Sequence, residues 1–82
     1  MKLYDKLSYE QILALQIMHN EPNMEASSIA KEADCSWDEL FVLAEMKLID
    51  IGVNRIKDNQ IHPKINTNGL LTLIASKMDG VL

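Results

Sequence analysis

The spacing of apolar residues changes twice along this chain, and the change limits the folds open to it. Up to Lys47 apolar residues recur every three or four positions, which predicts helices. They then alternate with polar residues over 49–54 and again over 61–66, which predicts two half-buried strands. Helical spacing returns after Thr67. Because 82 residues have room for only one hydrophobic core, we expect a single domain over 1–82.

Four helices are predicted, at about residues 8–19, 24–33, 36–46 and 67–78. The first and third begin with the sequence of a capping box, in which a Ser and a Gln or Glu three residues later satisfy each other's backbone N–H groups. The two pairs are Ser8 with Gln11 and Ser36 with Glu39. These local signals fix where two of the helices start.

Residues 49–65 are predicted to form a β-hairpin between the third and fourth helices. Lys57-Asp58-Asn59-Gln60 has the composition of a turn between the two strands. Pro63 cannot donate a ladder hydrogen bond, so the second strand is expected at a sheet edge. Thr67 is expected to cap the helix that follows, and Gly80 can end it.

Three short stretches have a packing and capping pattern found together in one known group of proteins. Residues 29–36, Ile-Ala-Lys-Glu-Ala-Asp-Cys-Ser, look like a junction in which an aliphatic-Ala pair precedes a turn and Ser starts the next helix. Residues 46–49, Met-Lys-Leu-Ile, look like the segment that leads into a wing. Residues 65–70, Ile-Asn-Thr-Asn-Gly-Leu, look like the Leu-Thr-x-x-Gly pattern that closes the wing.

In order and spacing these stretches resemble the winged-helix group of helix-turn-helix proteins, MarR-like regulators and small bacterial or phage proteins among them. The resemblance implies a mainly α fold with a small β-hairpin: a three-helix helix-turn-helix core, a two-stranded wing and a C-terminal helix. Two usual glycines are replaced, by Asp34 at the turn and Lys47 before the wing, where left-handed backbone is expected. The third helix is also about a turn shorter than in typical regulators.

The resemblance implies a small DNA-binding protein, a transcriptional regulator, and the predicted wing is the basic part of the chain. An Arg at a wing tip can enter the narrow minor groove of A·T-rich DNA. Cations on a hairpin also commonly protect a sheet edge from aggregation. The candidate DNA-binding residues are those of the wing and the start of the third helix: Arg55, Lys57, Asn59, Lys64 and Ser36.

The charge of the third helix argues against DNA recognition. In a winged helix this element enters the major groove, and its exposed side offers no Arg, Lys, Gln or Asn to read base edges. The residues on that side are Ser36, Trp37, Asp38, Phe41 and Glu45. Residues 1–50 also hold ten acidic and four basic side chains, whereas a DNA-binding protein normally carries a basic footprint.

The alternative hypothesis is an acidic protein-protein interaction module that does not bind DNA, such as a phage-type protein that docks on a host factor. Trp37, Phe41 and Glu45 follow each other every four positions and form one stripe, and exposed aromatic residues flanked by acidic ones suit a binding hot spot. The N-terminal residues Leu3, Tyr4 and Leu7 can instead fold over both rings and bury them. By fold the DNA-binding regulator is favoured, and by charge the interaction module.

Nothing in the sequence predicts catalysis, a metal site or a cofactor. His19, Cys35 and His62 are too widely spaced for a ligand set, and no catalytic triad, phosphate loop or carboxylate pair can be picked out. The single cysteine suits a reducing cytoplasm, and no apolar run approaches the ~20 residues of a membrane span. We therefore expect a cytoplasmic protein that is not an enzyme and has no membrane partner, and whether it forms a homodimer stays open.

Overall fold

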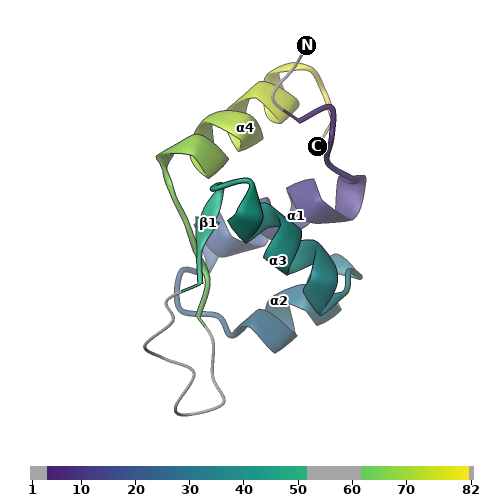
Figure 1. Cartoon of the computed structure of the whole chain (residues 1–82). Helices are drawn as coiled ribbons and strands as arrows, with labels where there is room; N and C mark the ends of the chain where they lie inside the picture. The colour runs from purple at the N-terminus through teal and green to yellow at the C-terminus, as the bar shows by residue number, and fades with distance from the viewer. Residues whose placement is uncertain (1–3, 52–61, 82) are drawn as a thin grey trace.

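The computed structural model describes residues 4–51 and 62–81, which form four helices and one antiparallel two-stranded sheet (Figure 1). In chain order the elements are α1 (Tyr9–Asn20), α2 (Ala26–Ala33), α3 (Trp37–Glu45), β1 (Ile49–Asp50), β2 (Lys64–Ile65) and α4 (Thr67–Met78). In the sheet, Ile49 lies opposite Ile65 and Asp50 opposite Lys64. The predicted hairpin turn, 57–60, lies outside the described residues.

Both predicted capping boxes are confirmed. The Ser8 hydroxyl accepts the Gln11 backbone N–H at 3.2 Å, and the Gln11 side chain accepts the Ser8 N–H at 2.9 Å. The Ser36 hydroxyl accepts the Glu39 backbone N–H at 3.4 Å, and the Glu39 carboxylate accepts the Ser36 N–H at 2.8 Å. The starts of α1 and α3 are therefore determined by a few neighbouring residues.

Of the other two helices, α2 starts later than predicted, and α4 starts at Thr67 as predicted but has a different cap. α2 begins at Ala26, two residues later than expected, because Met24 donates its backbone N–H to the Glu21 carbonyl in a turn and Glu25 is extended. The predicted Thr67 cap of α4 is wrong. The N-cap is Asn66, whose extended backbone lets its side-chain oxygen accept the Gly69 N–H at 2.9 Å.

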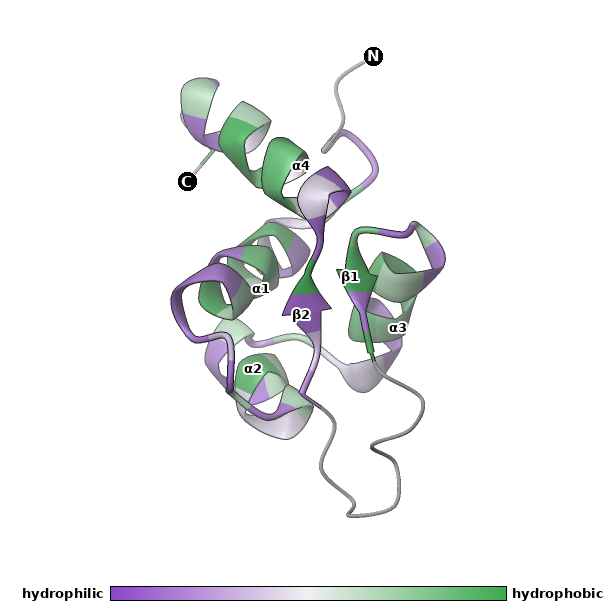
Figure 2. Ribbon diagram, turned by 90° about the vertical axis from the view of Figure 1, so that its left-hand side faces the viewer, coloured by the Kyte–Doolittle hydropathy of each residue, from purple (hydrophilic) through white to green (hydrophobic). Residues whose placement is uncertain are grey.

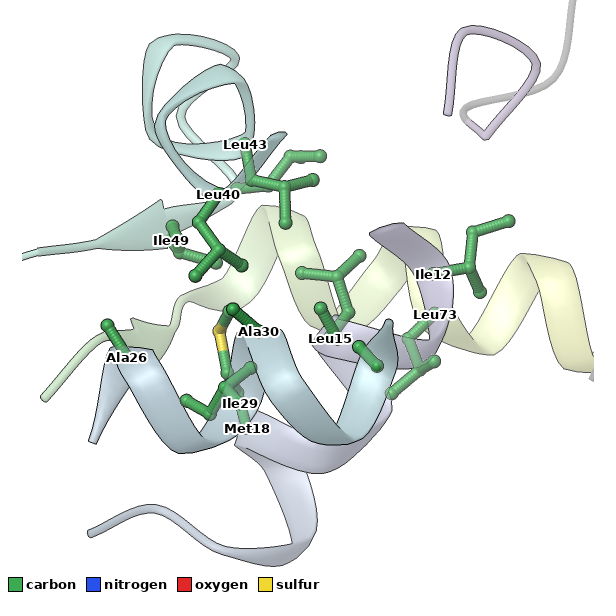
Figure 3. Packing of buried hydrophobic residues seen from close by; sticks show 13 residues of the cluster. Ile12, Leu15, Met18, Ala26, Ile29, Ala30, Leu40, Leu43, Ile49 and Leu73 are labelled. Atoms are coloured by element: carbon green, nitrogen blue, oxygen red, sulfur yellow. The ribbon is translucent and has the colours of Figure 1, made fainter. Parts of the chain in front are cut away.

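The core is centred on α1, which packs against α2, α3, α4 and β2. In both ribbon views α1 lies between α4 and α2 (Figures 1 and 2). Figure 3 shows the side chains that meet there. Among the largest fully buried side chains are Ile12, Leu15, Met18, Ile29, Leu43 and Leu73. This core holds α3 with one face inward and the other free.

Three helices end in the same hydrogen-bonded turn, which requires a left-handed residue. After α3 the Leu48 N–H reaches the Leu43 carbonyl and the Lys47 N–H reaches the Ala44 carbonyl, both at 3.0 Å. The left-handed residues are Asp34 after α2 (φ 57°), Lys47 after α3 (φ 61°) and Gly80 after α4 (φ 76°). The left-handed backbone expected at the two replaced glycines is thus confirmed.

Replacing Lys47 with glycine is expected to raise the free energy of unfolding by about 0.5–1 kcal/mol. A side chain in left-handed backbone costs roughly 1–2 kcal/mol, of which the greater freedom of glycine in the unfolded chain returns part. Urea denaturation of the two proteins measures the difference. Lys47→Ala keeps the Cβ atom, so its free energy of unfolding should rise far less. A Lys47→Gly protein less stable than the wild type would contradict the strain argument.

Candidate functional site

Two aromatic side chains project from α3 into solvent. Trp37 is 41% exposed and Phe41 is 43% exposed, although both are large apolar residues. They lie one turn apart, with ring centroids 6.1 Å from each other and planes inclined by 38°. Two rings in contact within the 4.5–7 Å range favourable for aromatic pairs form one continuous apolar surface.

The position of these rings follows from how α3 packs. Leu40 and Leu43 are buried, at 2% and 0% exposure, and they take the inner face of the helix. Trp37 and Phe41, four residues apart, therefore share a neighbouring face that the core leaves uncovered. Asp38 and Glu45, exposed on the same helix, flank them. We call Trp37, Asp38, Phe41 and Glu45 the α3 face.

The alternative in which N-terminal residues bury the two rings is wrong for the described residues. Tyr4 and Leu7 pack against the core instead, and the Tyr4 hydroxyl donates a hydrogen bond to the Asp79 carboxylate at the end of α4. Figure 1 shows the N-terminal segment beside α4. Leu3 lies outside the described residues. The described N-terminal segment is hydrogen-bonded to the end of α4 and does not cover Trp37 and Phe41.

A shallow apolar depression separates the two rings from the sheet. Its volume is about 10 Å³, close to that of a single water probe. The lining side chains are Ala26, Trp37, Leu40, Phe41, Ile49, Ile51 and Pro63. Small-molecule sites usually need ≈ 300–1,000 Å³, so this surface suits contact with another surface better than enclosure of a ligand.

The charged side chains of α3 are all acidic. The chain has five acidic residues and no basic residue between Lys31 and Lys47. Within the described part of the chain, neither Asp38 nor Glu45 has a basic side chain as an ion-pair partner. The Glu39 carboxylate is engaged in the cap of α3. An approaching molecule therefore meets two aromatic rings bordered by carboxylates that have no basic partner within residues 4–51 and 62–81.

The same negative field acts on Cys35, which lies half-buried just before α3. Burial raises the pKa of the Cys35 thiol above its ordinary value, and the carboxylates of Glu39, Glu10 and Asp34 raise it further, in that order. The thiol thus stays protonated at neutral pH and is a weak nucleophile.

Alkylation of Cys35 by iodoacetamide is expected to give a pH–rate profile whose midpoint lies above that of a free cysteine measured under the same conditions. Glu39→Gln should lower that midpoint, because it removes a carboxylate while a Gln at the same position can still complete the capping box. The shift should be partial, since burial is the largest cause. A wild-type midpoint at or below that of the free cysteine, or no shift in Glu39→Gln, would contradict this description of the field.

The predicted site residues fall into two groups. Ser36, Trp37, Phe41 and Glu45 lie together on α3 or at its start, with the Ser36 hydroxyl already used in the cap. Lys64 is exposed on β2, opposite Asp50. The remaining candidates of the predicted wing lie outside the described residues: Arg55, Lys57 and Asn59.

A second apolar surface lies on α4. Leu71, Ile74 and Met78 are 51%, 45% and 81% exposed. An open groove of about 320 Å³ runs beside Leu71. Its lining residues are Met46, Leu48, Asn68, Leu71 and Thr72. The sequence shows more apolar residues in this helix than one neighbour can cover, but spacing alone does not say which of them face inward.

Residues 4–51 and 62–81 contain no group of three or more His, Cys, Asp or Glu side chains placed to hold a metal ion. Over the same residues, no helix has the length and apolar character needed to cross a membrane. No protein-family model, curated protein or solved structure matches the chain.

Proposed function

We propose that this chain is a small cytoplasmic winged-helix protein that binds another protein through the α3 face and carries out no catalysis. The element order of helix, helix, helix, strand, strand and helix supports the winged-helix assignment. So do the left-handed residues at Asp34 and Lys47, where that group usually has glycine. In this assignment α2 and α3 are the helix-turn-helix pair, and the hairpin is the wing.

The observation that carries the proposal is the exposure of Trp37 and Phe41 in mutual contact on an otherwise acidic helix. Leaving apolar aromatic surface in water is unfavourable, at ~25 cal/mol per Å². Tryptophan is the residue most typical of binding hot spots, which form at the centre of an interface and exclude water. The core does not need these two rings outside it, so a partner that covers them is the simplest reason for their position.

DNA binding is the competing prediction, and the acidic charge of α3 argues against it. A winged helix that inserted α3 into the major groove would bring Asp38 and Glu45 toward phosphates, where like charges repel. Arg55 and Lys57 on the predicted wing, together with exposed Lys64, are the residues that favour it. Wing-led DNA binding therefore remains an alternative with a distinct salt and mutation signature.

Trp37→Ala and Phe41→Ala are each expected to weaken partner binding by about 30-fold or more, the loss of ~2 kcal/mol typical of a hot spot. The partner is isolated from an extract of the source cell, identified, purified and titrated against each variant by calorimetry. Leu71→Ala is the control, because it removes an equally exposed apolar side chain on α4. Circular dichroism of each variant checks that the fold survives.

Two results would contradict the proposal. One is a partner that binds the Trp37 and Phe41 variants as tightly as the wild type. The other is salt-sensitive binding of a labelled duplex, measured by fluorescence anisotropy at about 50 mM and about 200 mM salt. If that binding were lost in Arg55→Ala with Lys57→Ala and kept in Trp37→Ala, the wing and not the α3 face would be the binding surface.

A further inference from the structure

Resting on the proposed function, we infer that the partner presents a basic amphipathic helix to the α3 face, with an apolar side chain over the two rings and Lys or Arg residues beside it. The positions of the carboxylates relative to Trp37 and Phe41 determine which kind of partner can cover the α3 face.

Acidic side chains border the rings along α3 and beyond it. Asp38 directly follows Trp37, and Glu45 lies one turn beyond Phe41, both exposed. Asp34, exposed in the turn before α3, continues the border. A partner with an apolar centre and a cationic rim is complementary to this pattern, whereas an acidic peptide or a nucleic acid is repelled.

The state of Cys35 shows that the acidic field extends beneath the surface. The carboxylates of Glu39, Glu10 and Asp34 all act on this one thiol, so three negative groups lie near one another at the start of α3. A cation bound at this end of α3 is attracted by these carboxylates.

The shape of the face indicates how the apolar contact is made. The depression beside Trp37 and Phe41 holds about 10 Å³, too little for a leucine side chain to enter. The anchor therefore lies across the rings, and neighbouring Lys or Arg side chains can stack on the indole of Trp37 while reaching Asp38. An amphipathic helix presents this arrangement, with apolar residues on one face and cations at its edges.

Trp37 is the only tryptophan of the chain, so its fluorescence reports on the α3 face directly. Two designed helical peptides of about 15 residues are titrated, one of Leu and Lys and one of Leu and Glu with leucines at the same positions. The Leu/Lys peptide is expected to shift Trp37 emission to shorter wavelength saturably, with affinity that falls from about 50 to about 200 mM salt. The Leu/Glu peptide should produce no saturable shift.

Two matched double variants distinguish the effect of the carboxylates beside the rings from the effect of the protein's overall charge. The double variant Asp38→Asn with Glu45→Gln is expected to bind the Leu/Lys peptide about tenfold more weakly, a loss of ~1.4 kcal/mol of binding free energy. Glu21→Gln with Glu32→Gln removes the same number of charges from exposed positions after α1 and on α2, and should have little effect. A Lys/Ala peptide of the same charge lacks the leucine anchors and should bind more weakly than Leu/Lys.

Several outcomes would overturn the inference. These are equal binding of the Leu/Glu peptide, equal loss in the two double variants, or no saturable shift with the Leu/Lys peptide. None of them is the result that decides the proposed function, which depends on loss of the purified natural partner in Trp37→Ala and Phe41→Ala. An α3 face that binds its partner through neutral contacts would keep the proposed function and remove the inference.

Discussion

Gly69→Ala should lower the free energy of unfolding by about 3 kcal/mol, the upper end of what overpacking costs. A Cβ atom at Gly69 would overlap the Leu48 carbonyl oxygen and approach the Ile65 Cγ1 atom to 2.7 Å. The overlapped atom belongs to the backbone, so no side-chain rotation relieves it. The first turn of α4 must move away from the start of β1.

That movement would break a local set of hydrogen bonds. The Asn66 backbone N–H donates to the Leu48 carbonyl at 3.1 Å, and the Asn66 side-chain amide donates to the Lys47 carbonyl at 2.7 Å. Both bonds hold the start of α4 against the turn after α3. Because a small domain has only about 5–15 kcal/mol of stability in all, losing this contact should be evident in urea denaturation.

Gly80→Ala provides the control for the loss of a glycine as such. Gly80 has left-handed backbone, but a Cβ atom there meets nothing within 4 Å. Its substitution should cost about 1 kcal/mol from backbone strain alone. If Gly69→Ala destabilised the protein no more than Gly80→Ala, the close approach of α4 to β1 would not be the constraint described here.

Leu43→Ala should lower the free energy of unfolding by about 3–4 kcal/mol, because the side chain is fully buried and its removal leaves a cavity in the core. The adjacent Val42 is 40% exposed, so Val42→Ala should cost about 0.5–1 kcal/mol. Thermal and urea unfolding of the two variants test the difference. Similar losses at both positions would mean that α3 lacks the inner and outer faces on which the functional proposal depends.

The fold was predictable where the determining residues are close in sequence. Ser8 with Gln11 and Ser36 with Glu39 set helix starts through contacts within four residues, and the structure has both. Thr67 was misassigned as a cap because Asn66 precedes it and is an equally suitable cap. The choice between the two depends on the path of the chain from β2, which short-range patterns do not contain.

The residues that form the candidate site could be predicted from the sequence, but their exposure to solvent could not. Trp37, Phe41 and Glu45 fall on one stripe by spacing alone, next to the stripe of Leu40 and Leu43 that packs inward. Whether that stripe is covered depends on where the N-terminal segment packs, and its contact is with Asp79, 75 residues away from Tyr4. The exposure of the apolar residues of α4 could not be predicted for the same reason, since it depends on contacts between residues far apart in the sequence.

The hydrogen bond between Tyr4 and Asp79 also has a practical consequence. It keeps the first and last described turns of the chain together at α4, whereas Trp37 and Phe41 adjoin α2 and the sheet (Figure 1). A tag, surface tether or fused domain attached at either end therefore starts from the α4 side. Immobilised through either end, the molecule should present the α3 face to the solution, and the two orientations should capture the same partner.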